Sequence, residues 1–316
     1  MSINMLNEMI NNRIRRQIED LKDKRNAVIL AHVYQRKEVQ EIADYIGDSL
    51  DLSRKAMDTK ADVIVFCGVK FMAETAAILN PDKIVILPDN EAGCTLADMA
   101  PVENLKSTKR RYPNIPVVSY VNSTAEVKAE SDICCTSANA VDVVNSLDDD
   151  KVLFLPDKNL GSWVAEQTKK QIITWDGYCY VHEENITVEK IEKKKRMHPS
   201  AKTIVHPECH ESVRKLADFI GGTGDLRRHV KQDEATEFIV GTEDGIIHAL
   251  KKENPDKIFC PVGTICTGMK RINLEKVMLS LERMKYRVYV PEDIRSKSRI
   301  ALIEMLKASK TETHKI

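Results

Sequence analysis

The feature that most constrains this chain is an internal sequence repeat, which occurs in three copies. In each copy an apolar run leads into two polar residues separated by one position, and a hydroxyl residue follows 15 positions later. Equivalent positions of successive copies lie 88 and then 86 residues apart. The polar pairs are His32/Tyr34, Tyr120/Asn122 and His206/Glu208, and the hydroxyl residues are Ser49, Ser137 and Thr223. Self-similarity of this kind is typical of a fold built from repeated units.

A cysteine lies near the end of each copy. Cys94, Cys179 and Cys266 are spaced by 85 and 87 residues, and each lies in a turn-like segment. We expect the three loops to meet on a pseudo-threefold axis. Each loop would then bring one thiolate and a few polar groups to a common point.

The composition is that of a soluble globular protein. The 316 residues are 42% hydrophobic and 30% charged, which is enough chain for two or three domains. Lys and Arg together number 48, as do Asp and Glu, so no net field favours nucleic acid or an anionic membrane. The polar N-terminus does not resemble a signal peptide, and no apolar stretch reaches the ~20 residues of a membrane span. We therefore expect a cytoplasmic protein whose eight cysteines are thiols or metal ligands.

Strand-like and helix-like segments alternate along each copy. Most strand-like segments are continuous apolar runs, as expected of strands buried on both faces. The expected strands are 27–33, 61–67 and 83–88; 116–121, 151–155 and 171–174; and 202–205, 237–241 and 257–260, with shorter ones near 45–47, 133–135 and 219–221. The last apolar run of each copy begins at an equivalent position, 88 and then 86 residues apart: Lys83, Gln171 and Lys257. Such alternation implies parallel sheets covered by helices.

We therefore expect an α/β fold of three related three-layer α/β/α domains, each with a short parallel sheet. The expected domains are 1–98, 99–184 and 185–269. Residues 270–316 should return to the first domain with a helix at 273–284, a strand at 286–290 and a helix at 293–308. An N-terminal helix is expected at 5–22, with Met5, Met9, Ile14, Ile18 and Leu21 on or near one stripe.

The polar pairs fall at the carboxyl ends of expected strands, where parallel α/β sheets bind ligands. Each hydroxyl residue precedes a helix-like segment and could be an ordinary N-cap. Helix N-termini also hold anions, and three matched positions favour binding of a small carboxylate or phosphate compound. Glu208 is the one carboxylate among the six paired positions and the best general acid/base candidate. The paired histidines and tyrosines could orient or share protons.

The cysteine spacings match no zinc finger, since C-x-x-C pairs are absent. Widely spaced single cysteines can hold an iron–sulfur cluster, and three ligands for four irons would leave one iron open as a Lewis acid. Cys67, Cys134 and Cys135 are expected to be structural, and Cys209 has no counterpart in the other copies. Cys260 competes with Cys266 for the third ligand position. Cys266 is preferred because it lies past a strand end.

Several segments together resemble the iron–sulfur quinolinate synthase A family over essentially the whole chain. They are AHVYQ (31–35), GDSLDLSRKA (47–56), EAGCTLADM (91–99), SYVNS (119–123), TSANAV (136–141), WDGYCYVHE (175–183), HPEC (206–209) and CTGMK (266–270). The resemblance implies a pseudo-threefold α/β fold and a 4Fe–4S cluster. It implies condensation of iminoaspartate with dihydroxyacetone phosphate to quinolinate, phosphate and water, in NAD biosynthesis. The enzyme that supplies iminoaspartate could be a partner.

The resemblance also implies roles for individual residues. The cluster ligands would be Cys94, Cys179 and Cys266, whereas Cys209 would not be a ligand and Cys260 has no assigned role. Acid/base steps would fall to Glu208 and Tyr34, with His206 and Tyr120 as further catalytic residues. Substrate contacts would come from His32, Ser49, Tyr120, Asn122, Ser137, His206, Glu208 and Thr223.

Two other functions are compatible with the same residues. One is an iron–sulfur hydratase or dehydratase of a small dicarboxylic acid. The other is a non-enzymatic iron–sulfur sensor, which would have no use for Glu208 and for which neither a basic stripe nor a helix-turn-helix pattern is present.

Overall fold

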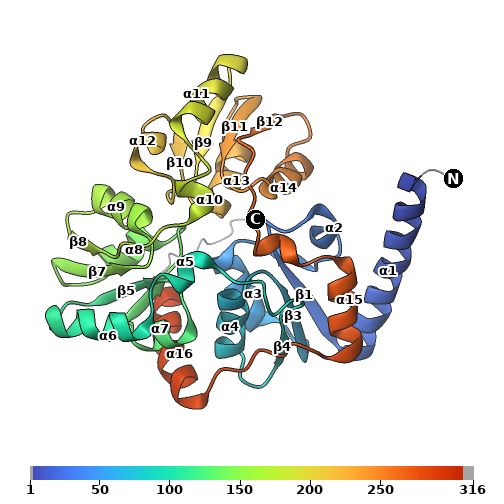
Figure 1. Cartoon of the computed structure of the whole chain (residues 1–316), viewed down its shortest axis with the longest axis horizontal. Coiled ribbons are helices and arrows are strands. Elements are labelled where there is room, and N and C mark those ends of the chain that lie inside the picture. The colour runs from blue at the N-terminus through green and yellow to red at the C-terminus, as the bar shows by residue number, and fades with distance from the viewer. Residues whose placement is uncertain (1–2, 309–316) are drawn as a thin grey trace. The chain divides into compact units, whose positions relative to one another are not determined.

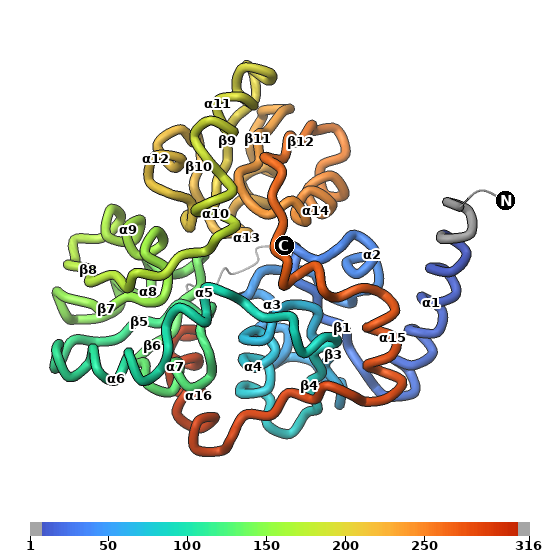
Figure 2. The backbone as a smooth tube through the Cα atoms, viewed as in Figure 1, coloured from blue at the N-terminus to red at the C-terminus, as the bar shows by residue number. Residues whose placement is uncertain are grey.

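The computed structural model describes residues 3–308, with side chains from residue 8 onward (Figures 1 and 2). The chain divides into two compact units. Unit 1 comprises Met1–Cys94 and Ile265–Val290, and unit 2 comprises Thr95–Thr264 and Pro291–Ile316. Among the described residues, no helix has both the length and the apolar character needed to cross a membrane.

Unit 1 contains one parallel four-stranded sheet in the order β2-β1-β3-β4. Its strands are β1 (Ala27–His32), β2 (Tyr45–Gly47), β3 (Val63–Cys67) and β4 (Ile84–Ile86). Its helices are α1 (Ile3–Arg25), α2 (Lys37–Gln40), α3 (Ser49–Asp58), α4 (Lys70–Leu79), the 3₁₀ helix η1 (Met269–Arg271) and α15 (Leu274–Arg283). Strands β1 and β3 are almost wholly buried, which explains their unbroken apolar sequences.

Unit 2 contains two parallel four-stranded sheets, in the orders β6-β5-β7-β8 and β10-β9-β11-β12. The strands are β5 (Val117–Tyr120), β6 (Ile133–Cys135), β7 (Lys151–Leu155) and β8 (Gln171–Thr174), then β9 (Lys202–Val205), β10 (Phe219–Ile220), β11 (Glu237–Gly241) and β12 (Ile258–Pro261). The helices are α5 (Thr95–Asp98), α6 (Val102–Arg111), α7 (Ala125–Ala129), α8 (Ala140–Asn145), α9 (Lys158–Gln167), α10 (Tyr180–Glu183), α11 (Val188–Met197), α12 (Glu211–Arg214), α13 (Thr223–Gln232), α14 (Ile246–Glu253) and α16 (Glu292–Ala308). All three sheets have the same strand order, so the α/β class and the repeat are confirmed.

A carboxylate clamp recurs in all three copies. Asp44, Asp132 and Asp218 each accept a hydrogen bond, at 2.7 Å, from a backbone N–H in the first strand of their copy. The donors are Ile29, Val117 and Thr203. The clamp ties the start of the edge strand to the neighbouring strand and fixes their register.

The loop after the first strand is closed by a different residue type in each copy. Buried Gln40, Lys128 and Arg214 donate to the carbonyls of Gln35, Ser123 and Cys209, respectively. Both sets keep the intervals of 88 and 86 residues. An amide, an ammonium and a guanidinium thus perform the same task, because each is a hydrogen-bond donor of sufficient reach.

The repeat pairs Gln171 with Lys83 and Lys257, but the residue that makes the same contacts in the second copy is its neighbour Lys170. Lys83 and Lys257 each donate to carbonyls that precede the third strand of their copies. In the second copy the residue that does so is Lys170, which donates to the carbonyl of Leu147. The ammonium group, rather than the start of the apolar run, therefore marks this position.

The segment after Cys266 departs most from expectation. Helix α15 packs on α1, within unit 1. No strand forms at 286–290. Instead the segment passes β4, forming one antiparallel bridge between Ile86 and Arg287 (Figure 2).

Helix α16 does not return to the first sheet, as the sequence had suggested, but packs on α7 and β6 in unit 2 (Figure 1). Its buried residues are Ser298, Ala301, Leu302 and Met305. Because β6 is an edge strand, this apolar face covers an edge that would otherwise be open.

Other differences are local. The sequence predicts helices at 37–45 and 211–219, whereas α2 and α12 are single turns. On α1, Ile18 is buried but Met9 is 59% exposed, and the side chain of Met5 lies outside the described residues.

Candidate active site

The expected polar residues lie at the carboxyl ends of strands. His32 and Tyr120 are the last residues of β1 and β5, and His206 directly follows β9. In two copies the loop has the same turn. His32 Nδ1 accepts from Tyr34 N at 3.1 Å, and His206 Nδ1 accepts from Glu208 N at 3.3 Å. This backbone contact orients each imidazole ring at the end of its strand.

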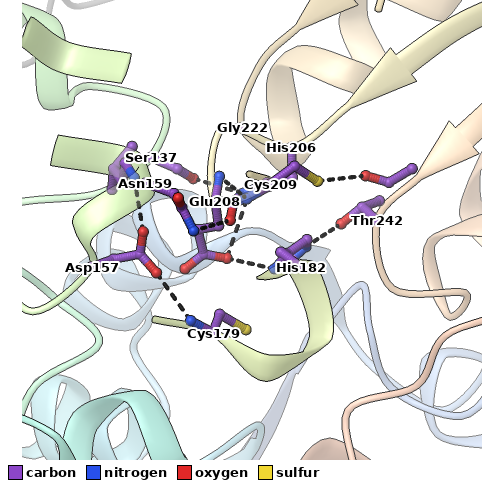
Figure 3. Close-up of polar contacts among 12 residues, drawn as sticks. Ser137, Asp157, Asn159, Cys179, His182, His206, Glu208, Cys209, Gly222 and Thr242 are labelled. Atoms are coloured by element: carbon purple, nitrogen blue, oxygen red, sulfur yellow. Dashed lines mark hydrogen bonds and ion pairs between the residues drawn. The ribbon is translucent and has the colours of Figure 1, made fainter. Parts of the chain in front are cut away.

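In unit 2, residues from the second and third sheets converge (Figure 3). His206 Nε2 lies 3.2 Å from Ser137 Oγ. The loop that leads into α13 is equally close, since a Cβ at Gly222 would lie 2.9 Å from the same oxygen. Only glycine allows this approach, which brings the start of α13, at Thr223, next to Ser137.

Glu208 is the centre of this cluster. Its Oε2 lies 2.8 Å from His182 Nδ1 and 3.2 Å from His206 Nδ1. The two imidazole rings stack with centroids 4.6 Å apart, and His182 Nε2 lies 2.9 Å from Thr242 Oγ1. Glu208 Oε1 is buried and has no hydrogen-bond partner among the described residues. One carboxylate oxygen is therefore held in place while the other remains available to a ligand.

A second buried carboxyl, that of Asp157, lies close enough to Glu208 to feel its charge. It follows β7 and caps α9, accepting from Leu160 N at 2.7 Å and from Cys179 N at 3.1 Å. The amide of Asn159 donates to the Glu208 carbonyl at 3.1 Å. The Asn159 bond fixes the backbone of Glu208, and the Asp157 bonds fix the starts of α9 and α10.

The surroundings move the pKa values of the two carboxyls in opposite directions. Burial raises the pKa of Glu208, but the charges of His206 and His182 outweigh it and hold the pKa below its ordinary value. Burial and the charge of Glu208 raise the pKa of Asp157 well above its ordinary value. Burial lowers the pKa of His206. Neighbouring groups with divergent pKa values are typical of sites that perform acid/base chemistry.

Sequence reasoning missed His182 and Asp157. His182 lies three residues after Cys179 on the single turn of α10, and this Cys-x-x-His spacing was a usable signal. Cys179, His182 and Glu208 present ligand atoms within 4.8 Å of one another and could hold a metal ion. Asp157 carries no comparable signal, since an aspartate before a helix is usually only a cap.

The three hydroxyl residues are not N-caps. The caps of α3 and α13 are Asp48 and Gly222, so Ser49 and Thr223 are the first helical residues. Ser137 lies in the loop before α8, whose cap is Asn139. In α3 the Asp48 carboxylate takes the N–H groups of Leu50 and Asp51, which leaves the Ser49 hydroxyl free of a capping role.

The other residues expected in the site lie in unit 1: His32, Tyr34, Ser49, Cys94 and Cys266. The rings of His32 and Tyr34 meet edge to face, with centroids 4.6 Å apart. The loops of Cys94 and Cys266 touch through the glycines beside them, because a Cβ at Gly268 would lie 2.2 Å from the Gly93 carbonyl oxygen.

Exposure divides the eight cysteines into two groups. Cys94, Cys179 and Cys266 are partly exposed, while Cys67, Cys134, Cys135, Cys209 and Cys260 are buried. Burial raises the pKa of each buried thiol, to about 12 for Cys134. At the four thiols with no exposed surface, Cys67, Cys134, Cys135 and Cys209, this disfavours the thiolate form that binds metals. The partly exposed cysteines are the three that the repeat had selected.

A buried carboxylate beside two imidazoles, at the strand ends of an α/β fold, is typical of enzymes that act on small polar molecules. A model of the family described as quinolinate synthetase A protein matches residues 16–307. Quinolinate synthase 1 of Methanosarcina acetivorans is 53% identical over 293 residues, covering 92% of this chain and 96% of that protein. Quinolinate synthase of Dehalococcoides mccartyi is 54% identical over 296 residues, covering 93% and 98%. That of Thermodesulfovibrio yellowstonii is 52% identical over 298 residues, with the same coverage. The chain belongs to the quinolinate synthetase A family.

Proposed function

We propose that this enzyme condenses iminoaspartate with dihydroxyacetone phosphate to form quinolinate, phosphate and water. Membership of the family supports quinolinate as the product and NAD biosynthesis as the pathway. The structural observation that carries the proposal is the Glu208 carboxylate, with one oxygen held by two imidazoles and the other unpartnered among the described residues.

The proposed ligands of a 4Fe–4S cluster are Cys94, Cys179 and Cys266. The residues fit such a group, because these thiols are partly exposed and two of their loops are pressed together at Gly93 and Gly268. Three thiolates are the soft donors that iron–sulfur clusters require. When bound, the cluster would supply a Lewis-acidic iron for loss of water.

Substrate binding is assigned to the hydroxyl and amide groups at the strand ends. In unit 2 these are Tyr120, Asn122, Ser137, His206 and Thr223, and in unit 1 they are His32 and Ser49. Asn122 Oδ1 is buried and has no hydrogen-bond partner among the described residues, which is expected of a group that receives its partner from a ligand. Hydroxyl and N–H donors suit the carboxylates of iminoaspartate.

Acid/base steps are assigned to Glu208, Tyr34, His206 and Tyr120. Loss of phosphate by elimination requires one group to take a proton and another to donate one. Glu208 is held as a carboxylate and can take a proton at Oε1. His206 Nε2 and the two phenols can donate, and all of these side chains are buried, so bulk water does not compete.

The proposed setting is the cytoplasm, and the proposed protein partner is the enzyme that supplies iminoaspartate, since an imine hydrolyses readily in water.

Cysteine variants test the cluster ligands. Cys94→Ala, Cys179→Ala and Cys266→Ala should each abolish the cluster absorbance after anaerobic reconstitution. Cys209→Ala, Cys260→Ala and Cys67→Ala should retain it. A normal cluster in Cys266→Ala would remove this residue from the ligand set.

A substrate assay separates the synthase from a hydratase. The reconstituted enzyme should release phosphate from dihydroxyacetone phosphate only when iminoaspartate is present, and quinolinate should form in equal amount. Hydration of a dicarboxylic acid without consumption of the triose phosphate would favour the hydratase instead.

A further inference from the structure

A second cluster of metal-ligating side chains lies at the opposite end of the third sheet from the active site. Glu237 is the first residue of β11, Cys260 lies in the adjacent strand β12, and His198 follows α11. The ligand atoms of the three residues all lie within 4.8 Å of one another. None of the three takes part in the chemistry assigned above.

The separations are close to those of a tetrahedral metal site. Zinc bonds of about 2.0–2.3 Å to nitrogen, oxygen and sulfur imply ligand–ligand distances of about 3.4–3.6 Å. Cys260 Sγ lies 3.7 Å from Glu237 Oε1, and His198 Nδ1 lies 2.7 Å from the same oxygen. The nitrogen–oxygen pair must widen, and the His198 side chain is 27% exposed and can move outward.

The surroundings support a bound cation. Ser200 Oγ donates to Glu237 Oε2 at 3.2 Å and so orients the carboxylate, as residues around metal ligands commonly do. Cys260 is backed by an apolar cluster that includes Ile191 and Ile239. Ions can enter from the side of His198 and Glu237, which are partly exposed.

We propose that His198, Glu237 and Cys260 bind one zinc-class divalent cation, which joins the end of α11 to β11 and β12. One sulfur, one nitrogen and one oxygen donor form a set that suits zinc, with a fourth position left for water. A thiolate and a carboxylate together neutralise the two positive charges of the ion. The proposal is independent of the reaction assigned above.

Cobalt(II) is the probe, added anaerobically to the cluster-loaded enzyme so that the cluster cysteines are occupied. One equivalent should bind and produce a cobalt–thiolate charge-transfer band as a difference spectrum. Zinc(II) should abolish the band by displacement. Cys260→Ser should lack the band, and His198→Asn should weaken binding at least about tenfold.

Matched controls keep the result specific. Cys67→Ser alters a buried thiol in unit 1, and His229→Asn alters a partly exposed histidine in the third sheet's domain; both should bind cobalt as the wild type does. Absence of a band in the wild type would overturn the proposal. A band that persists in Cys260→Ser, or unchanged affinity in a folded His198→Asn variant, would also overturn it.

Discussion

At the residue scale, a spacing of two positions at a strand end creates a preorganised imidazole. The Nδ1 atoms of His32 and His206 each lie within hydrogen-bond distance of the backbone N–H two residues further on, which fixes the orientation of the ring. The residue in the second position differs between the copies. In the first copy it is the Tyr34 phenol and in the third it is the Glu208 carboxylate, so one turn presents two different proton carriers.

Glu208→Gln should therefore lower kcat by about 10²–10⁴-fold and leave KM little changed. Glutamine preserves the shape of the side chain but cannot take a proton. Steady-state kinetics of the reconstituted enzyme check this, with the exposed Glu211→Gln as a control that should behave as the wild type. Near-normal turnover in Glu208→Gln would remove Glu208 from the chemistry.

At the element scale, the three copies use the same clamps with different amino acids. The aspartate clamp keeps its residue type, whereas the loop-closing donor changes from Gln40 to Lys128 to Arg214. Hydrogen-bonding capacity, rather than residue identity, is therefore the property that the repeat retains at these positions.

Asp132→Ala should lower the free energy of unfolding by about 1–3 kcal/mol, because the Val117 N–H loses a charged acceptor. Asp132→Asn should cost less, since its amide oxygen can still accept. Urea unfolding of the apoprotein measures the difference. The exposed Asp149→Ala is the control, with an expected change within about 0.5 kcal/mol. Equal effects of Asp132→Ala and Asp149→Ala would contradict a stabilising clamp.

The glycines beside two proposed cluster ligands offer a matched pair. Gly268→Ala would place a Cβ 2.2 Å from the Gly93 carbonyl oxygen, so the Cys266 loop must shift away from the Cys94 loop. Gly93→Ala meets no atom closer than 4.0 Å. Iron and sulfide content after reconstitution should therefore fall in Gly268→Ala and stay normal in Gly93→Ala. Equal loading of the two variants would show that this close approach does not position the ligands.

At the scale of the whole molecule, each unit is made of two stretches that are separated in the sequence. Residues 265–290 complete unit 1, and the chain then re-enters unit 2, where α16 covers the edge strand β6. The stability of the second sheet thus depends on residues more than a hundred positions further along the chain.

Leu302→Ala should therefore destabilise unit 2 by about 2–4 kcal/mol, because Leu302 is fully buried against the second sheet's layer. Ile300→Ala on the same helix is the control, since Ile300 is 64% exposed. Native-state hydrogen exchange should show faster exchange of β5 and β6 amides in Leu302→Ala, with β1 and β3 unchanged. Faster exchange in β1 rather than β6 would contradict the placement of α16.

The sequence by itself determined the strands of the three sheets, the α/β class and the strand-end position of the polar pairs. These features depend on local apolar patterns and on the repeat, each copy of which forms its own sheet. It also singled out three cysteines, which proved to be the partly exposed ones.

Only the tertiary structure decided that His182 reaches Glu208, that Asp157 lies behind it, that α16 belongs to unit 2, and that Cys260 lies beside Glu237 and His198. The physical reason is the same in each case. These contacts join segments far apart in the chain, and their formation depends on how apolar faces pack, which no local pattern of residues encodes.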